Sequence, residues 1–317
     1  MKATVAIIEE ALAAYPAACI AFSGGDDSLT VVDIIHRHLG LRLPLLYCDS
    51  LMDYPGTADF VRETAARYNT DAIIATAPHT PLQQWTRYGW PFLGKMPARK
   101  WMQQHKQRAM GFRLDATGCC RKMKIEPARR AMRAHGFEMQ FTGLRGGQDD
   151  QMRGFRALRD GAIKYVATDK IVVASPLIGW TDAMIRRYLT RHELTRHPAK
   201  AAGAQTIGCI FCAGGTRYTG NSYLILRHTQ PEIWRRLIVD LRAGEVLLAV
   251  KYDQPLDIIR AAIKELGGLP RLARERPWLF DYATTSPIEG YDRALFDVQD
   301  DSGNGSDSED SARPAAE

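Results

Sequence analysis

The chain has 317 residues, of which 45% are hydrophobic and 25% are charged, a composition typical of a globular protein rather than a disordered or fibrous one. The length allows one large domain or two smaller ones, each with a substantial buried core. Because no apolar run is long enough to span a bilayer and the N-terminus lacks the residue order of a secretion signal, the sequence predicts a cytoplasmic protein with no membrane partner.

The net charge of +6 is distributed unevenly along the chain. Residues 297–317 contain seven acidic side chains and one arginine, so this segment contributes −6 and leaves +12 on residues 1–296. A body this basic favours polyanions such as nucleotides or nucleic acid, although a solvated basic surface has the same composition.

Apolar runs alternate with amphipathic stretches through the first two thirds of the chain. In chain order, we expect strands at residues 17–22, 43–47, 72–75, 139–142 and 171–174. We expect helices at residues 29–39, 55–68, 127–135 and 182–192. This alternation predicts an α/β fold in which a doubly wound parallel sheet is covered by helices on both faces.

Two other regions break this alternation. Residues 78–118 have no clear period and combine Trp85, Trp90 and Trp101 with several lysines and arginines, which indicates an insertion of short helices over the carboxyl edge of the sheet. Helical patterns return at residues 232–241, 256–266 and 270–275. The predicted domains are therefore an α/β domain over residues 1–225, a helical C-terminal extension over 226–296 and a disordered acidic tail over 297–317.

A glycine-rich turn, called the glycine loop below, lies between the first predicted strand and the first predicted helix and consists of Ser23, Gly24, Gly25, Asp26, Asp27 and Ser28. Its glycines allow a sharp turn that exposes backbone N–H groups, and these donors together with the positive end of the helix form a cradle for phosphate. Ser23 and Ser28 can add hydroxyl donors, and Asp27 can hold Mg²⁺ against the phosphates. The alternative is an ordinary strand–helix turn in which Asp27 or Ser28 caps the helix.

The chain has six cysteines: Cys19, Cys48, Cys119, Cys120, Cys209 and Cys212. The adjacent pair and the C-x-x-C pair can supply four thiolates to an iron–sulfur cluster, and nearby lysines and arginines suit an anionic thiolate site. A four-cysteine zinc site and two unrelated pairs of thiols remain the alternatives. Cys19 and Cys48 lie within or at the end of predicted strands, where we expect them to be structural.

These motifs together resemble those of a known superfamily. The glycine loop is similar to the Ser-Gly-Gly-x-Asp-Ser PP-loop of the ATP pyrophosphatases, which include the phosphoadenosine phosphosulfate reductase family. Residues 119–127 resemble the Cys-Cys-x-x-x-Lys-x-x-Pro stretch of the assimilatory sulfonucleotide reductases, and residues 207–212 resemble their Gly-Cys-x-x-Cys end. Residues 142–145 and 175–181 resemble two further landmarks of the family, Thr-Gly-x-Arg and Pro-Leu-x-x-Trp-Thr.

The resemblance implies a fold like that of the adenine nucleotide alpha hydrolases, in which the PP-loop binds ATP. The nucleotide-binding residues are then Ser23, Gly24, Gly25, Asp26, Asp27, Ser28, Asp49 and Arg145. Asp49 ends the second predicted strand near the adenosine, and Arg145 contacts a phosphate or sulfate of the nucleotide. Many relatives carry lysine at the position of Asp26, and Ser50 and Leu51 depart from the Thr-Gly that usually follows Asp49.

The same resemblance implies that the metal centre is a [4Fe–4S] cluster. Its ligands are then Cys119, Cys120, Cys209 and Cys212, and Lys124 is the basic residue beside it. The residues that act in catalysis are then Asp27, Ser28, Lys124 and Arg145, assisted by Mg²⁺.

The choice within the superfamily depends on one further thiol. A sulfonucleotide reductase attacks the sulfate sulfur with a cysteine on its C-terminal tail, and no cysteine follows Cys212 in this sequence, which disfavours reduction. A PP-loop with a cluster but without that thiol resembles the DndC and SspD proteins of bacterial DNA phosphorothioation. That resemblance implies that a DNA phosphate oxygen attacks the α-phosphate of ATP and releases pyrophosphate. Sulfur from a cysteine desulfurase or another donor protein then displaces the adenylated oxygen.

Three other functions fit parts of the pattern. A tRNA-thiolating PP-loop enzyme also combines ATP with a cluster, and a reductase-like enzyme could act on a small sulfonucleotide such as PAPS or APS. A non-catalytic nucleotide or redox sensor could use the same pocket. ATP turnover separates an enzyme from a sensor, and stimulation of that turnover by nucleic acid separates a polymeric from a small substrate.

Overall fold

The computed structural model describes residues 1–51, 53–80, 83, 104, 120–146, 158–204, 207–209 and 222–280. Most of the predicted insertion at 78–118 and the whole acidic tail at 297–317 lie outside these residues, as do Cys119 and Cys212. No helix in the described ranges combines the length and the apolar composition that crossing a bilayer requires.

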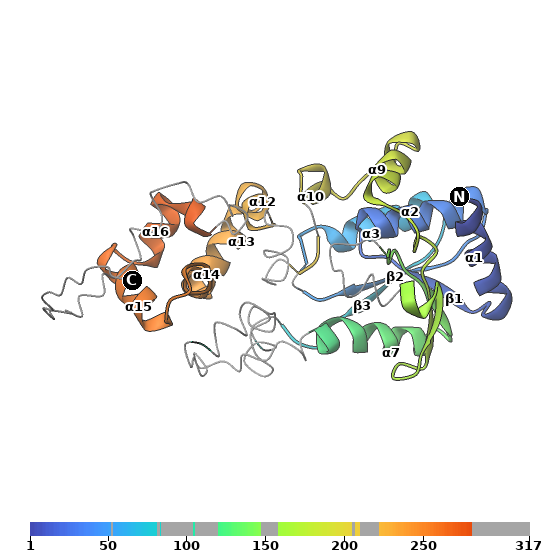
Figure 1. Cartoon of the computed structure of the whole chain (residues 1–317), viewed down its shortest axis with the longest axis horizontal. Helices are drawn as coiled ribbons and strands as arrows, with labels where there is room; N and C mark the ends of the chain where they lie inside the picture. Colours follow the sequence, from blue (N-terminus) through green and yellow to red (C-terminus); the bar gives the residue numbers. More distant parts are fainter. Residues whose placement is uncertain are drawn as a thin grey trace, which may run out of the picture.

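A six-stranded sheet organises the first part of the chain (Figure 1). Its strands are β1 (Ala18–Ala21), β2 (Leu45–Asp49), β3 (Ala72–Thr76), β4 (Met139–Phe141), β5 (Ile163–Val166) and β6 (Ile171–Ala174), and their spatial order is β3-β2-β1-β4-β6-β5. All neighbouring strands are parallel except β5, which pairs antiparallel with β6 at the edge. The five predicted strands are present, and β5 is an addition that the sequence did not predict.

Helices cover both faces of this sheet, which confirms the doubly wound architecture. One face carries α1 (Lys2–Ala14), α2 (Asp26–Asp33), α3 (Thr57–Arg67) and α9 (Asp182–Arg191), whereas α7 (Glu126–Ala134) covers the other (Figure 1). A π-helical turn, Ile34–His38, extends α2, and another, Arg121–Ile125, precedes α7. The chain order of the strands reverses between β1 and β4, and in open α/β sheets ligands bind outside the carboxyl ends of the strands at such a reversal.

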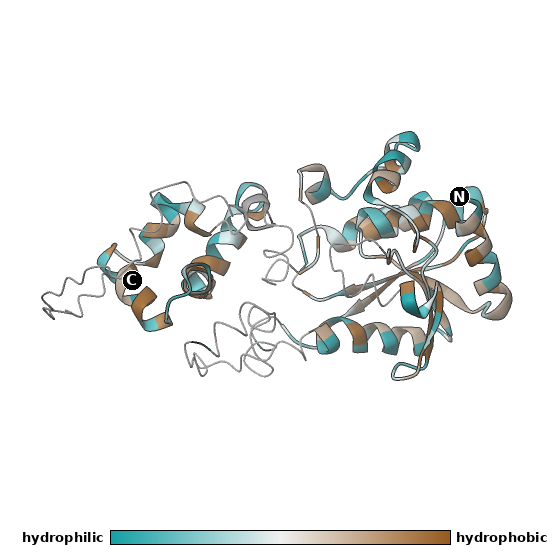
Figure 2. Cartoon of the chain, in the orientation of Figure 1, coloured by the Kyte–Doolittle hydropathy of each residue, from teal (hydrophilic) through white to brown (hydrophobic). Residues whose placement is uncertain are grey.

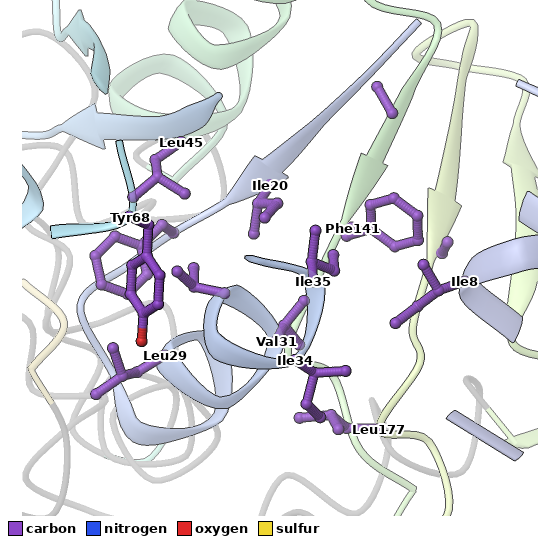
Figure 3. Packing of buried hydrophobic residues seen from close by; sticks show 14 of the residues in the cluster. Ile8, Ile20, Leu29, Val31, Ile34, Ile35, Leu45, Tyr68, Phe141 and Leu177 are labelled. Atoms are coloured by element: carbon purple, nitrogen blue, oxygen red, sulfur yellow. The ribbon is translucent and has the colours of Figure 1, made fainter. Parts of the chain in front are cut away.

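The alternation of side chains along the strands divides the core into two layers. On the face of α2, Ile20, Leu45 and Phe141 of the sheet pack against Val31, Ile34 and Ile35, as Figure 3 shows. On the face of α7, Cys19 and Leu46 pack against Met132. Cys19 is fully buried, as expected for a structural thiol.

A group of helices follows the α/β part. It consists of α12 (Ser222–Thr229), α13 (Pro231–Arg235) with a π-helical turn (Arg236–Asp240), α14 (Ala243–Tyr252), α15 (Leu256–Glu265), α16 (Leu269–Glu275) and a 3-10 turn (Pro277–Phe280). These helices carry hydrophilic and hydrophobic segments side by side (Figure 2). Their apolar side chains form a separate core that also contains Tyr54 and Ile207 of the α/β part.

The carboxylate of Asp33 joins three of the helices above the sheet. It is fully buried at the end of α2, and it accepts hydrogen bonds from the hydroxyls of Tyr68 at 2.6 Å and Tyr188 at 2.7 Å. Tyr68 directly follows α3 and Tyr188 belongs to α9, while the guanidinium of Arg37 lies 2.9 Å from the same carboxylate. One side chain therefore fixes how α2, α3 and α9 pack.

We predict that Asp33→Ala lowers the free energy of unfolding by about 2–4 kcal/mol, because two buried tyrosine hydroxyls lose their acceptor. Urea-induced unfolding followed by circular dichroism measures this change. Asp59→Ala is the control, since Asp59 forms an exposed ion pair with Arg62 and its loss should cost less than about 1 kcal/mol. Equal effects of the two substitutions would contradict the role given to Asp33.

Candidate active site

The glycine loop connects β1 to α2 at the reversal of strand order. Gly24 has φ +76°, a left-handed conformation that glycine adopts without strain. The hydroxyl of Ser28 donates to the carbonyl of Gly25 at 2.9 Å and lies 3.2 Å from the hydroxyl of Ser23. The residue that caps α2 is Gly25, so neither Asp27 nor Ser28 is the helix cap, and the ordinary-turn interpretation is wrong on this point.

The turn after β4 lies directly against the glycine loop. A Cβ atom added to Gly143 would lie 2.7 Å from the backbone nitrogen of Ser28 and 2.8 Å from the carbonyl carbon of Asp27, distances that real Cβ atoms essentially never show. Only glycine therefore allows the two backbones to approach this closely. This approach brings Arg145, two residues further along, to the beginning of α2.

Arg145 joins the two turns through its guanidinium. Its Nε donates to Asp27 Oδ1 at 3.0 Å, one terminal nitrogen donates to Asp182 Oδ1 at 2.5 Å, and the other donates to the carbonyl of Trp180 at 3.3 Å. Burial alone would lower the pKa of Arg145, but the two carboxylates raise it above its usual value. Two of the predicted site residues, Asp27 and Arg145, are thus in direct contact as a partly buried ion pair.

Asp26 meets two cations from a distant segment of the chain. Arg196 donates Nε to Oδ1 at 2.9 Å and a terminal nitrogen to Oδ2 at 2.7 Å, and Nζ of Lys200 lies 3.3 Å from Oδ2. Burial would raise the pKa of Asp26, but these two cations more than offset it and lower the pKa. Sequence reasoning missed Arg196 and Lys200, which lie about 170 residues from the loop and carry no local signal.

His197 packs against the glycine loop. It is buried, and its Nδ1 accepts the backbone N–H of Ala199, so Nε2 carries the proton and donates to Thr57 Oγ1 at 3.1 Å. Burial lowers the pKa of His197, which keeps the ring neutral near pH 7. Its ring and Ile207 both lie within 4 Å of the position that a Cβ of Gly24 would take.

A second polar group, called the lysine cluster below, lies at the carboxyl end of β2 and consists of Lys124, Asp53, Tyr47, Ser50 and Cys209. Lys124 Nζ donates to Asp53 Oδ1 at 3.1 Å, and Asp53 Oδ2 accepts from the hydroxyls of Tyr47 at 2.8 Å and Ser50 at 3.0 Å. The Ser50 hydroxyl lies 3.3 Å from Cys209 Sγ. Burial would lower the pKa of Lys124, but Cys209 and Asp53 both form hydrogen bonds with the ammonium and raise it.

The lysine cluster contains one of the four predicted metal ligands, Cys209, and a second, Cys120, lies nearby in the sequence. Cys209 interacts with Lys124, and Cys120 is exposed four residues before Lys124, immediately ahead of the π-helical turn. The other two predicted ligands, Cys119 and Cys212, lie outside the described residues.

The remaining predicted binding residue, Asp49, ends β2. Its carboxylate accepts the backbone N–H of Leu51 at 2.8 Å, and this contact holds Leu51 in a left-handed conformation with φ 58°. Its role beside an adenosine stays a prediction. Asp53, which the sequence analysis did not select, proves to be the acceptor at the centre of the lysine cluster.

Cys19 and Cys48 are the two cysteines outside the predicted ligand set. Burial raises the pKa of each of the two thiols to about 12. Cys48 also lies near Lys124, which opposes the shift, and its thiol donates to the carbonyl of Met123 at 3.4 Å. Both thiols are therefore protonated, weak nucleophiles at neutral pH.

A third group of potential ligands occupies the opposite end of α2. The ligand atoms of Asp33, His38 and His192 lie within 4.8 Å of one another. Both oxygens of Asp33 already accept tyrosine hydroxyls, and Arg37 adds a positive charge beside them. A metal ion there would have to displace these donors, so we interpret the group as structural.

Comparison with known proteins gives a family for most of the α/β part. Residues 17–215 match the model of the phosphoadenosine phosphosulfate reductase domain. The phosphoadenosine 5'-phosphosulfate reductase of Alkalilimnicola ehrlichii is 29% identical over 168 residues, which cover 53% of this chain and 59% of that protein. The adenosine 5'-phosphosulfate reductase of Bacillus pumilus is 25% identical over 192 residues, which cover 61% of this chain and 71% of that protein.

Among solved structures, the phosphoadenylyl-sulfate reductase of Candida auris in complex with phosphate aligns with a TM-score of 0.45 and 19% identity, covering 65% of this chain and 87% of that chain. The match to the Alkalilimnicola ehrlichii protein spans less than two thirds of its length.

Alkylation tests the thiol chemistry of the candidate site. At mildly alkaline pH, about 8, a thiol with a pKa of about 12 is roughly 0.01% ionised, so we predict that iodoacetamide leaves Cys19 and Cys48 unmodified in the folded, metal-free protein. The exposed Cys120 should react within minutes. Peptide mass spectrometry measures both, with urea-unfolded protein as the control in which all thiols react. Rapid native modification of Cys48 would contradict its assignment as a protonated thiol.

Proposed function

Because the chain belongs to the phosphoadenosine phosphosulfate reductase domain family, we propose that its glycine loop is a working PP-loop that binds ATP and that ATP is split between its α- and β-phosphates. We propose further that this reaction serves sulfur transfer and that a [4Fe–4S] cluster takes part in it. The observation that carries the proposal is the contact between Asp27 and Arg145 at the reversal of strand order.

The position and chemistry of this contact support nucleotide binding. The glycine loop lies outside the carboxyl end of β1, beside β4, where doubly wound sheets bind nucleotides. Arg145 is held as a buried cation whose guanidinium can stabilise negative charge on a phosphate, and Asp27 is the residue that would hold Mg²⁺ to neutralise the phosphates.

These residues can perform an adenylation. An acceptor oxygen attacks the α-phosphorus of ATP, the bond from the α-phosphorus to the bridging oxygen breaks, and pyrophosphate leaves with the electron pair. Arg145 would stabilise the charge that develops on the phosphate oxygens. The hydroxyls of Ser23 and Ser28, which already face each other across the loop, would orient the leaving pyrophosphate.

The thiols near the lysine cluster fit the ligand set of an iron–sulfur cluster. Cys209 interacts with Lys124, whose positive charge suits a group of thiolates, and Cys120 lies four residues before Lys124 in the chain. Cys119 and Cys212 would complete four ligands. A [4Fe–4S] cluster, when bound, supplies iron that can bind sulfur and exchange electrons. Lys124 would hold the ligand Cys209 in place through its hydrogen bond, and Asp53 would orient Lys124.

The thiols of the chain favour sulfur transfer over reduction. Cys19 is fully buried, burial holds the pKa of both Cys19 and Cys48 at about 12, and residues 213–317 contain no cysteine. None of these positions offers a thiolate to attack a sulfate sulfur. Reduction of a small sulfonucleotide is the second candidate, because the curated relatives are named as reductases of PAPS and APS.

We propose the DNA backbone as the acceptor and a cysteine desulfurase or another donor protein as the source of sulfur. The support is electrostatic, since residues 1–296 carry a net charge of +12 and a polyanion would be attracted to them. The aromatic and basic insertion at residues 78–118 would suit a nucleic-acid partner, but it lies mostly outside the described residues, so that role stays a prediction.

The first experiment measures pyrophosphate release from ATP and Mg²⁺ in the presence of DNA, of tRNA, or of neither. We predict release that DNA stimulates, and a loss of about 100-fold in the Asp27→Ala/Ser28→Ala variant, because that variant removes the magnesium ligand and a loop hydroxyl. Asp59→Ala, an exposed carboxylate on α3, is the control and should retain full activity. Unchanged release by the loop variant would refute the assignment of the loop.

The second experiment tests the metal centre. Anaerobic purification should yield about four iron and four sulfide per chain, with a broad visible absorption. The Cys120→Ser/Cys209→Ser variant should lose the iron, whereas the matched Cys48→Ser variant should keep it, since Cys48 is not a proposed ligand. Iron retained in the double variant would contradict the ligand set, and zinc in place of iron would identify the alternative four-cysteine site.

A further inference from the structure

The outer face of α9, called the arginine face below, carries three exposed arginines: Arg186, Arg187 and Arg191. Within the ranges that the structure describes, no ion pair engages any of the three. Of the acidic residues nearest to them in the sequence, Asp182 is bound by Arg145, and Glu193 pairs with none of the three arginines. The arginine face therefore presents positive charge to solvent.

The apolar side of α9 is already occupied. Ile185, Tyr188 and Leu189 are buried in the core that α9 shares with α2 and the sheet, and Met184 is the one large apolar side chain of α9 that is exposed. A helix that binds a membrane surface inserts its apolar side among the lipids, and the apolar side of α9 is not free to do so. The arginine face therefore fits a partner that is recognised by its charge.

Further cations gather at the C-terminal end of α9, around His192. The ring of His38 meets that of His192 edge-on with 5.0 Å between their centroids, and Arg37 donates to the carbonyl of His192 at 3.3 Å. Burial lowers the pKa of His192, and Asp33 opposes this shift. Arg37, Arg191 and, when protonated, His38 lower the pKa further. These cations extend the positive surface from α9 to the end of α2.

The segment that contains α9 contacts the glycine loop at two places. At the beginning of α9, Asp182 accepts a hydrogen bond from Arg145 at 2.5 Å, and Arg145 also donates to Asp27 of the loop. Beyond the helix, Arg196 donates two hydrogen bonds to Asp26. A ligand that lies along α9 therefore reaches the loop at the first turn of the helix.

The dimensions of α9 suit a nucleic-acid backbone. With 10 residues and a rise of 1.5 Å per residue, the helix is about 15 Å long. Duplex DNA carries one negative charge per roughly 1.7 Å of its axis, so about nine phosphates lie within such a length. Arg187 and Arg191 are four residues apart and share one side of the helix, so each guanidinium can bind a different phosphate.

We propose that the arginine face of α9 binds the backbone of duplex DNA and brings one of its phosphates to the glycine loop. This inference rests on the proposed function, in which the DNA backbone is the acceptor, and it names the surface that the acceptor uses. Because contacts with phosphates carry no sequence information, the arginine face holds the duplex without reading its sequence.

A second basic helix supplies a matched control. On α7, which covers the opposite face of the sheet, Arg130 and Arg133 are exposed, and among the described residues they also form no ion pair (Figure 1). Substituting two arginines on either helix therefore removes the same charge from opposite faces of the molecule.

The test is the binding of the full chain to fluorescein-labelled duplex DNA, or to labelled tRNA, followed by fluorescence anisotropy over a series of salt concentrations. Arg187→Ala/Arg191→Ala should weaken DNA binding about tenfold and reduce the slope of log K against log salt by about 2, since two phosphate contacts are lost. Alanine is a better helix former than arginine, so this variant should keep the helix. Arg130→Ala/Arg133→Ala should retain the slope and bind DNA within about twofold of the wild type.

Two further variants separate charge from structure. Arg187→Lys/Arg191→Lys keeps both charges and should retain the salt slope and most of the affinity. Arg187→Glu/Arg191→Glu should weaken DNA binding beyond the alanine variant, because carboxylates repel the phosphates. Two duplexes of unrelated sequence should bind the wild type with affinities within about threefold of each other.

The outcomes separate this inference from the function on which it rests. If DNA stimulates pyrophosphate release but Arg187→Ala/Arg191→Ala binds DNA like the wild type, the arginine face is the wrong surface and the proposed function stands. Equal losses in the α9 and α7 variants would show that only the overall charge matters and would overturn the inference. A loss of affinity confined to tRNA would overturn the choice of DNA. A wild-type chain that neither binds DNA nor responds to it overturns both the inference and the proposed acceptor.

Discussion

The close approach of two backbones, at Gly143 and at the beginning of α2, is the constraint on which the candidate site depends. The parallel pairing of β1 with β4, in the register Ala18 with Met139 and Ile20 with Phe141, sends both following turns out of the same edge of the sheet. A side chain at position 143 would overlap Asp27 and Ser28, so glycine is required there. Because the two turns are in contact, the guanidinium of Arg145, only two residues after Gly143, reaches Asp27 directly.

The second principle of the site is that its charges are held in pairs that originate in different elements. Asp26 is paired with cations that follow α9, Asp27 with the turn after β4, and Lys124 with Asp53 beyond β2. The cations lower the pKa of Asp26 and the carboxylates raise that of Arg145, so both groups stay ionised through the neutral range. A site assembled in this way presents fixed charges before a ligand arrives, which reduces the reorganisation that binding requires.

The sequence predicted the features that local patterns determine. The glycine loop, the five strands and the helices α2, α3, α7 and α9 all follow from glycine placement and hydrophobic period, because each pattern lies within the element that it describes. The strand β5 escaped prediction because it is a short, largely exposed edge strand. The helix α14 escaped because it is apolar on most sides and buried among its neighbours, so it has no amphipathic period. The sequence also did not predict three charged partners, because only the topology of the fold brings them to their sites: Asp53, Arg196 and Lys200.

The segment 207–209 joins the two halves of the candidate site. Ile207 contacts the position of Gly24, and Cys209 contacts Ser50 and Lys124. Two residues along a chain are at most about 7 Å apart between Cα atoms, so the residue that packs against the loop and the residue that bears the thiol are close neighbours. This short connection, rather than either motif alone, is the physical reason to consider the glycine loop and Cys209 together.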